Sequence, residues 1–104
     1  MEQIAFLMRL KPGQEEEYRK RHDEIWPELK AALTAAGIRD YSIFHDPETD
    51  ILFAFHRVTK PDRMEDLFAQ PVMQKWFVHM SDIMETNPDR TPAQVALNEV
   101  FHID

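Results

Sequence analysis

The stretch ILFAF at residues 51–55 places apolar side chains in an unbroken row, directly after the turn-forming residues 46–50. Neighbouring side chains of a strand point to opposite faces of its sheet, so this run predicts a strand that is apolar on both faces. The segment IAFLMRL at residues 4–10 has the same character until Arg9. We therefore expect two strands whose faces both have to be covered.

A helical pattern follows the strand at residues 4–10 and ends before a further strand at residues 38–45. Its apolar stripe recurs every three or four residues and consists of Tyr18, His22, Ile25, Leu29 and Leu33. Proline removes a backbone hydrogen bond and clashes with the preceding turn, so Pro27 should kink or interrupt the helix just after His22. Gly37 is placed to end the helix in the left-handed conformation.

The second half of the chain contains another helical pattern and a last strand. The helix begins at Pro61, is interrupted at Pro71 and continues to Ile83, before a loop at residues 86–92 and a strand at 95–102. The resulting order β-α-β-β-α-β is the split arrangement of a ferredoxin-like fold. We expect one α+β domain over residues 1–104, with two helices on one face of a four-stranded antiparallel sheet.

The apolar character of the two central strands bears on the oligomeric state. Two helices can cover only one face of the sheet, whereas the strands at 4–10 and 51–55 are apolar on both. A second copy of the chain, packed sheet against sheet, would cover the other face. The sequence therefore predicts a homodimer.

Composition excludes several classes of function. The chain has 104 residues, and 12 Lys and Arg against 19 Asp and Glu give a net charge of −7, a sign that repels nucleic-acid backbones. No apolar run approaches the roughly 20 residues that cross a bilayer, so we expect no membrane partner. The absence of cysteine fits a reducing cytoplasm. Neither a helical zinc pattern nor a glycine-rich phosphate loop is present, so we expect no metal and no nucleotide cofactor.

His22 is the position most informative about chemistry. It falls inside the apolar stripe and therefore points at the sheet, either as a core histidine with satisfied ring nitrogens or as a proton-transfer group. The adjacent break at Pro27 favours a shaped site. Tyr18, Tyr41 and Trp76 could border a pocket around His22, although packing alone is the alternative for each tryptophan.

Several segments of the chain resemble those of a known protein family. The block YRKRHDEIWPEL at residues 18–29 resembles the first-helix signature of the L-rhamnose mutarotases. The segment QKWF at 74–77 with Met80, the loop NPD at 87–89 and the closing EVF at 99–101 match the same family in order and spacing. The likeness runs essentially from end to end.

The resemblance implies a dimeric α+β barrel that interconverts the α and β anomers of L-rhamnose without a cofactor. It implies that His22 is the proton donor, that Tyr18 and Tyr41 bind the sugar, and that Trp76 and Phe77 stack on it. The family often has tryptophan at the position of Phe77, so this chain keeps a stacking face and loses an indole donor there. The second proton-transfer group stays open among Tyr18, Tyr41 and Glu28, in that order.

Two other functions compete with this interpretation. The first is a small cofactor-free monooxygenase of the antibiotic-biosynthesis type, which has the same fold and a pocket lined by Trp, Tyr and His. The second is a non-catalytic ligand-binding module of the kind found in transcription regulators, which would require a tethered DNA-binding segment. Dioxygen uptake with an aromatic substrate would favour the monooxygenase, whereas exchange between sugar anomers would favour the mutarotase.

Overall fold

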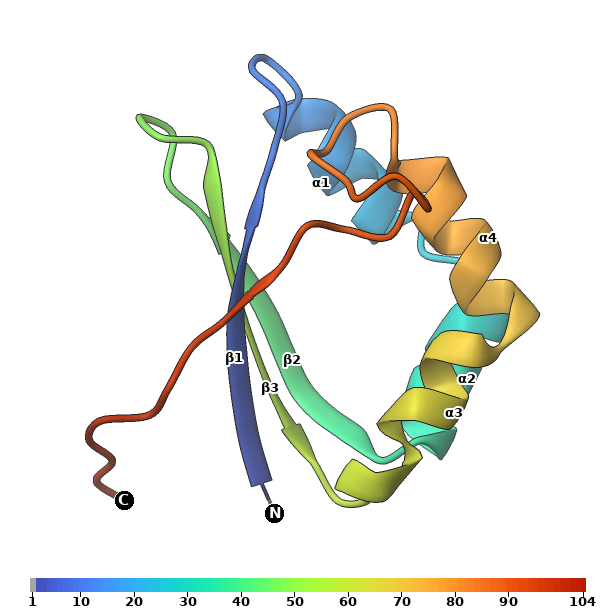
Figure 1. Ribbon diagram of the computed structural model, residues 1–104, viewed down its shortest axis with the longest axis vertical. Helices are drawn as coiled ribbons and strands as arrows, with labels where there is room; N and C mark the ends of the chain where they lie inside the picture. Colours follow the sequence, from blue (N-terminus) through green and yellow to red (C-terminus); the bar gives the residue numbers. More distant parts are fainter. Residues whose placement is uncertain (1) are drawn as a thin grey trace.

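The computed structural model describes residues 2–104, which form an antiparallel sheet of four strands with a layer of helices on one side (Figure 1). The elements are β1 (Glu2–Arg9), α1 (Glu15–Asp23), α2 (Pro27–Ala35), β2 (Ile38–His45), β3 (Ile51–Val58), the short 3-10 helix η1 (Pro61–Arg63), α3 (Met64–Ala69), α4 (Pro71–Met80) and β4 (Val95–Ala96). The strand order is β2-β3-β1-β4, so the two apolar strands are the central pair, as predicted. The ferredoxin-like arrangement is confirmed.

Both prolines inside the helical patterns act as helix starts. The chain leaves α1 at Asp23, turns at Glu24, is extended at Trp26 and begins α2 at Pro27, so the expected interruption separates two helices. In the same way Pro71 is the first residue of α4. A proline at a first helical position loses nothing, since that N–H would have no partner within the helix. The second pattern was predicted to continue to Ile83, but α4 ends at Met80 and Ile83 is buried in the turn that follows.

Gly37 adopts the predicted left-handed conformation, with φ +90°. A Cβ atom at this position would also collide with Oγ1 of Thr59, the residue whose backbone N–H donates to the Gly37 carbonyl at 2.9 Å. The glycine therefore does two things: it ends the helical segment and allows the chain after β3 to pass close by.

The last strand is much shorter than predicted. Only Val95–Ala96 form β4, paired with β1, and Leu97 adds one hydrogen bond from its N–H to the Ala5 carbonyl at 3.0 Å. Beyond it the chain continues without strand pairing to the C-terminus (Figure 1), where Nδ1 of His102 lies 3.2 Å from Nε2 of Gln3 in β1. The prediction of a strand to His102 is therefore wrong for the single chain. Alternating apolar residues indicate that side chains need burial, but they do not show that a neighbouring strand is available for pairing. Val100 is 95% exposed.

The two faces of the sheet differ in how they are covered. On the helix side Leu52, Ala54 and Val58 of β3 are buried in the core. The residues of β3 that alternate with this face point to the opposite side of the sheet, where Phe53 is 43% exposed and Phe44 of β2 is 68% exposed. The second face of the central strands is thus apolar and open in the single chain. Among residues 2–104, no helix combines the length and apolar character required to span a bilayer.

Candidate active site

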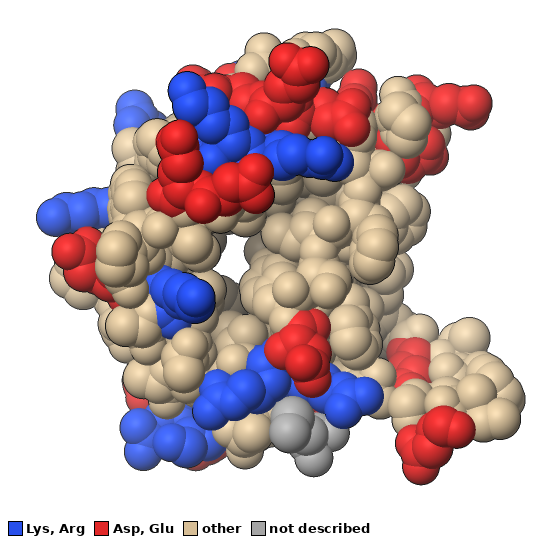
Figure 2. Space-filling model, turned by 180° about the vertical axis from the view of Figure 1, so that it is seen from behind, with Lys and Arg blue, Asp and Glu red and all other residues tan. Residues whose placement is uncertain are grey.

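A cavity of about 720 Å³ lies between the helix-facing side of the sheet and the helices. Figure 2 shows the molecule hollowed at this place, with mostly uncharged surface around the opening. Its wall contains every site residue predicted from the sequence: Tyr18, His22, Tyr41, Trp76 and Phe77. These residues come from α1, β2 and α4, so the fold brings together side chains that are far apart in the sequence.

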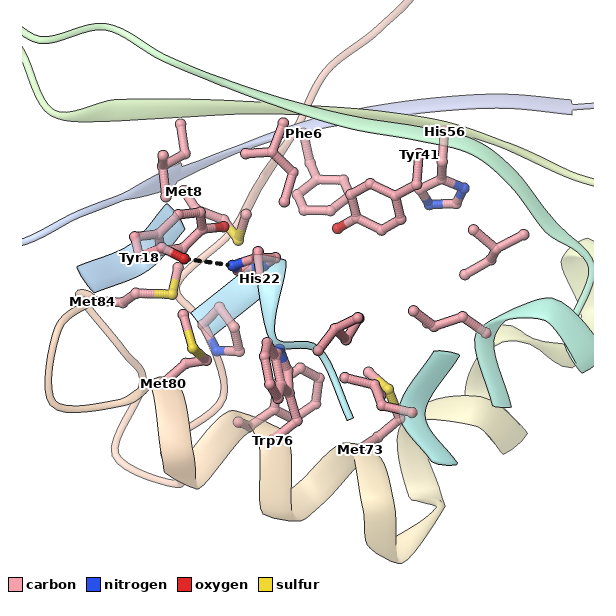
Figure 3. Close-up of a pocket in the computed structure, with 18 of the residues that line it drawn as sticks. Phe6, Met8, Tyr18, His22, Tyr41, His56, Met73, Trp76, Met80 and Met84 are labelled. Atoms are coloured by element: carbon pink, nitrogen blue, oxygen red, sulfur yellow. Dashed lines mark hydrogen bonds between the residues drawn. The ribbon is translucent and has the colours of Figure 1, made fainter. Parts of the chain in front are cut away.

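His22 is held in one tautomer by its own helix. Its Nδ1 lies 3.0 Å from the backbone carbonyl of Tyr18, one turn earlier in α1 (Figure 3). Because a carbonyl can only accept, Nδ1 carries the proton and Nε2 is left with a free lone pair. Burial lowers the pKa of His22 below its usual 6.5, an effect that the Tyr18 carbonyl partly opposes. At neutral pH the imidazole is therefore uncharged and able to accept a proton at Nε2.

Aromatic rings enclose the imidazole. The Tyr18 ring lies against His22 with ring centroids 4.3 Å apart, and the Trp76 ring meets it edge to face at 5.4 Å. Trp26, in the break before α2, packs edge to face on Trp76 at 5.1 Å. The predicted interruption at Pro27 thus places an indole behind Trp76, where it fixes the orientation of that ring.

The two tyrosines supply phenol groups that stay protonated. Burial raises the pKa of Tyr18, and the nearby Tyr41 raises it further. Although 40% of Tyr41 is exposed, its hydroxyl points into the cavity toward His22 (Figure 3), and burial there raises its pKa to about 12. Both hydroxyls are therefore hydrogen-bond donors throughout the physiological range of pH.

A β-bulge explains how Tyr41 reaches the cavity. The register between β2 and β3 shifts between Arg39 and Ser42, and Asp40 has a left-handed backbone with φ +52°. The extra residue keeps both Ile38 and Tyr41 on the helix side, which a regular strand could not do because side chains alternate. Bulges commonly turn a side chain toward a site in this manner.

The structure also shows which of the other polar residues line the cavity. Glu28, the last candidate for the second proton transfer, is exposed on α2 and does not line the cavity. His56 does line the cavity and is buried, although it is not among the site residues predicted from the sequence. The signal that could have identified it is its alternation with Leu52 and Ala54, which places it on the helix-facing side of β3. Within residues 2–104, His, Asp and Glu side chains form no group of three or more suited to a metal ion.

Comparison with known proteins decides the family. The family model for L-rhamnose mutarotase matches residues 3–103. The L-rhamnose mutarotase of Bacteroides thetaiotaomicron is 53% identical over 104 residues, which is all of both chains. The chain belongs to the L-rhamnose mutarotase family. The crystal structure of a family member from Formosa agariphila superposes with a TM-score of 0.94 at 44% identity, covering both chains completely.

The competing monooxygenase interpretation receives support at the level of the fold alone. A putative antibiotic biosynthesis monooxygenase from Nitrosomonas europaea superposes with a TM-score of 0.63, but it is only 8% identical over 95% of this chain and 89% of its own. Similar folds can carry unrelated activities. The likeness to the mutarotases covers sequence and structure together.

Proposed function

We propose that this chain interconverts the α and β anomers of L-rhamnose by general acid–base ring opening and closure, with residues 1–104 forming a single mutarotase domain. The observation that carries the proposal is the neutral His22, whose free Nε2 lies in a cavity lined by two protonated phenols and an indole face. Sugar hydroxyls suit the phenols, and the apolar face of a pyranose suits the indole. The proposal requires no cofactor.

The reaction consists of two proton transfers at neighbouring oxygens. Ring opening removes the proton of the anomeric hydroxyl and adds a proton to the ring oxygen as its bond to C1 breaks, which gives the open-chain aldehyde. Rotation about the C1–C2 bond followed by the reverse transfers gives the other anomer. Both oxygens are attached to the same carbon, so one imidazole nitrogen can serve them in turn.

The state of His22 supports an order for these transfers. The neutral imidazole accepts the anomeric proton at Nε2, and the imidazolium then passes a proton to the ring oxygen. His22 is thus the group that protonates the ring oxygen, and it does not have to be charged beforehand. The carbonyl of Tyr18 keeps Nδ1 protonated and stabilises the transient positive charge, as an orienting acceptor does for a catalytic histidine.

The remaining residues have distinct roles in this proposal. Tyr18 and Tyr41 donate hydrogen bonds to sugar oxygens and stabilise the negative charge that develops when the anomeric proton leaves. In this order of transfers both phenols act as donors, and Tyr18, whose ring lies against His22, is the first candidate to donate to the anomeric oxygen. Trp76 and Phe77 supply stacking faces on the α4 side of the cavity.

We further propose a homodimer that packs sheet against sheet, located in the cytoplasm. The exposed Phe44 and Phe53 support the dimer, because an apolar face of this kind is costly to leave in water. Val95 and Leu97 extend the same face along β4. The absence of cysteine supports a reducing compartment.

Nuclear magnetic resonance tests the activity directly. Saturation of the α-anomer signal of L-rhamnose should transfer to the β-anomer signal when the protein is added, at a rate proportional to protein concentration. Epimers of L-rhamnose in the same assay report how strictly the hydroxyl pattern is recognised. Anomer exchange no faster than in buffer would refute the proposal, and dioxygen uptake with an aromatic substrate would support the monooxygenase instead.

A further inference from the structure

His56 is a buried polar side chain that the proposed mechanism does not use. It lies on β3 opposite Ile4 of β1 and faces the helices, and only 2% of it is exposed. Its neighbours on the same face of β3 are the apolar Ala54 and Val58. A histidine in such surroundings loses its hydration, and burial accordingly lowers the pKa of His56. The ring is therefore uncharged at neutral pH.

His56 lies between two aromatic rings from the neighbouring strands, Phe6 and Tyr41. Phe6 of β1 meets the imidazole edge-on, with centroids 6.3 Å apart and planes at 74°. On the other side the imidazole lies nearly parallel to the phenol of Tyr41, at 5.1 Å and 28°. Nδ1 is 3.4 Å from the carbonyl of Arg57, which sets the rotation of the ring about its stem. Figure 3 shows His56 beside Tyr41, with the Tyr41 hydroxyl directed away from His56 and toward His22.

Tyr41 needs such a neighbour because its backbone is irregular. The residue lies in the bulge between Arg39 and Ser42, where the β2–β3 ladder is broken, and it follows the left-handed Asp40. The face of its ring is therefore fixed less by the strand than by what packs on it, and the packed ring is His56. A displacement of the phenol would move its hydroxyl away from the space in front of His22.

We propose that His56 is a positioning residue of the active site, whose ring stacks on Tyr41 and aims the Tyr41 hydroxyl at the bound sugar. This inference rests on the proposed function for its consequence in catalysis, whereas the placement of the Tyr41 ring is a property of the protein alone. Planarity is what the position requires, so another flat ring can replace the imidazole. A branched aliphatic side chain cannot.

The test compares His56→Phe with His56→Val in the anomer-exchange assay. His56→Phe keeps a flat ring and should retain kcat/KM within about twofold, whereas His56→Val should lower kcat/KM by about three- to tenfold, the size expected for one aromatic pair. The same loss in both variants would overturn the role assigned to stacking. His56→Gln removes the ring while keeping a polar side chain, and it should behave like His56→Val, so a failure of the valine variant to fold leaves the test intact.

A double-mutant cycle asks whether His56 acts through Tyr41. In a Tyr41→Phe background, where no hydroxyl remains to be aimed, His56→Val should cause no further loss of kcat/KM. An equal loss in both backgrounds would overturn the proposal, because it would mean that His56 acts by another route, such as general packing.

A spectroscopic readout separates this inference from the proposed function. The chain has 2 tyrosines, so ring-labelled tyrosine gives two sets of resonances, and Tyr18→Phe assigns them. His56→Val should shift the Tyr41 ring resonances and leave those of Tyr18 in place, and His56→Phe should keep the Tyr41 ring ordered. Unchanged Tyr41 resonances in His56→Val would overturn the proposal even if the wild-type protein exchanges anomers. Shifted resonances without anomer exchange would support the placement and refute the proposed function.

Discussion

Replacement of His22 by glutamine removes the proton-transfer group from the cavity and leaves most of its wall in place. General acid–base catalysis by a positioned side chain contributes about 10²- to 10⁴-fold to a rate. We therefore expect kcat for anomer exchange to fall by that factor, equivalent to about 2.7–5.5 kcal/mol of activation free energy. KM should change little, because Tyr41, Trp76 and Phe77 still line the cavity.

The structure also sets the expected effect on stability, which distinguishes lost chemistry from lost folding. The side chain of His22 hydrogen-bonds to the Tyr18 carbonyl, and the loss of this bond costs about 0.5–1.5 kcal/mol of unfolding free energy. His102→Gln in the exposed tail is the matched control and should keep full activity. Saturation transfer between the anomer signals gives the rates, and urea unfolding gives the stability. A folded His22→Gln variant with kcat within threefold of the wild type would refute the assignment of His22.

Three further outcomes follow from the same structure. The rate of anomer exchange should be constant near neutral pH and fall as the pH drops through the lowered pKa of His22, below 6.5, since only the neutral imidazole accepts the anomeric proton. A rate that instead falls as the pH rises through neutrality would mean that the charged imidazole is the active form. Phe53→Glu should convert the proposed dimer to a monomer in analytical ultracentrifugation at micromolar concentration, because it introduces a charge on the exposed apolar face of the sheet. A wild-type protein that is already monomeric would contradict the proposed sheet-to-sheet dimer. Gly37→Ala should lower the melting temperature more than Gly13→Ala. Both glycines have positive φ, which costs about 1–2 kcal/mol for alanine, but only at Gly37 would the new methyl group also collide with Thr59. Equal losses of melting temperature in the two variants would contradict the predicted collision.

Hydrophobic periodicity sufficed to predict most of the fold because the relevant signals are local. The run at residues 51–55 and the two prolines, Pro27 and Pro71, act on their own segments, through strand alternation and the missing N–H of proline. The C-terminal segment shows where this reasoning stops. Val95 and Phe101 alternate as a strand would, but whether a neighbouring strand is there to pair with depends on the rest of the molecule.

The candidate site was predictable to a similar extent. His22 could be found because a histidine in an apolar helical stripe is conspicuous, and Tyr41 because a buried phenol requires a partner. The resemblance to the mutarotases supplied Phe77, which periodicity alone would not distinguish from a core residue. His56 was missed because its significance lies in a contact with Tyr41 across two strands, at a ring separation of 5.1 Å. A contact of this kind depends on strand register, and the register here includes a bulge that hydrophobic patterns do not reveal.

The two walls of the cavity are each shaped by one break in regular structure. On the helix side the interruption before Pro27 brings Trp26 behind Trp76, and on the sheet side the bulge at Asp40 turns Tyr41 inward. Each break forgoes regular backbone hydrogen bonds, which a fold selected for stability alone would retain. Both breaks act on the space in front of His22. That coincidence is expected if the breaks serve to hold an indole face and a phenol hydroxyl around one imidazole. A continuous helix would remove the support that Trp26 gives to Trp76, and a regular strand would turn the Tyr41 hydroxyl away from the cavity.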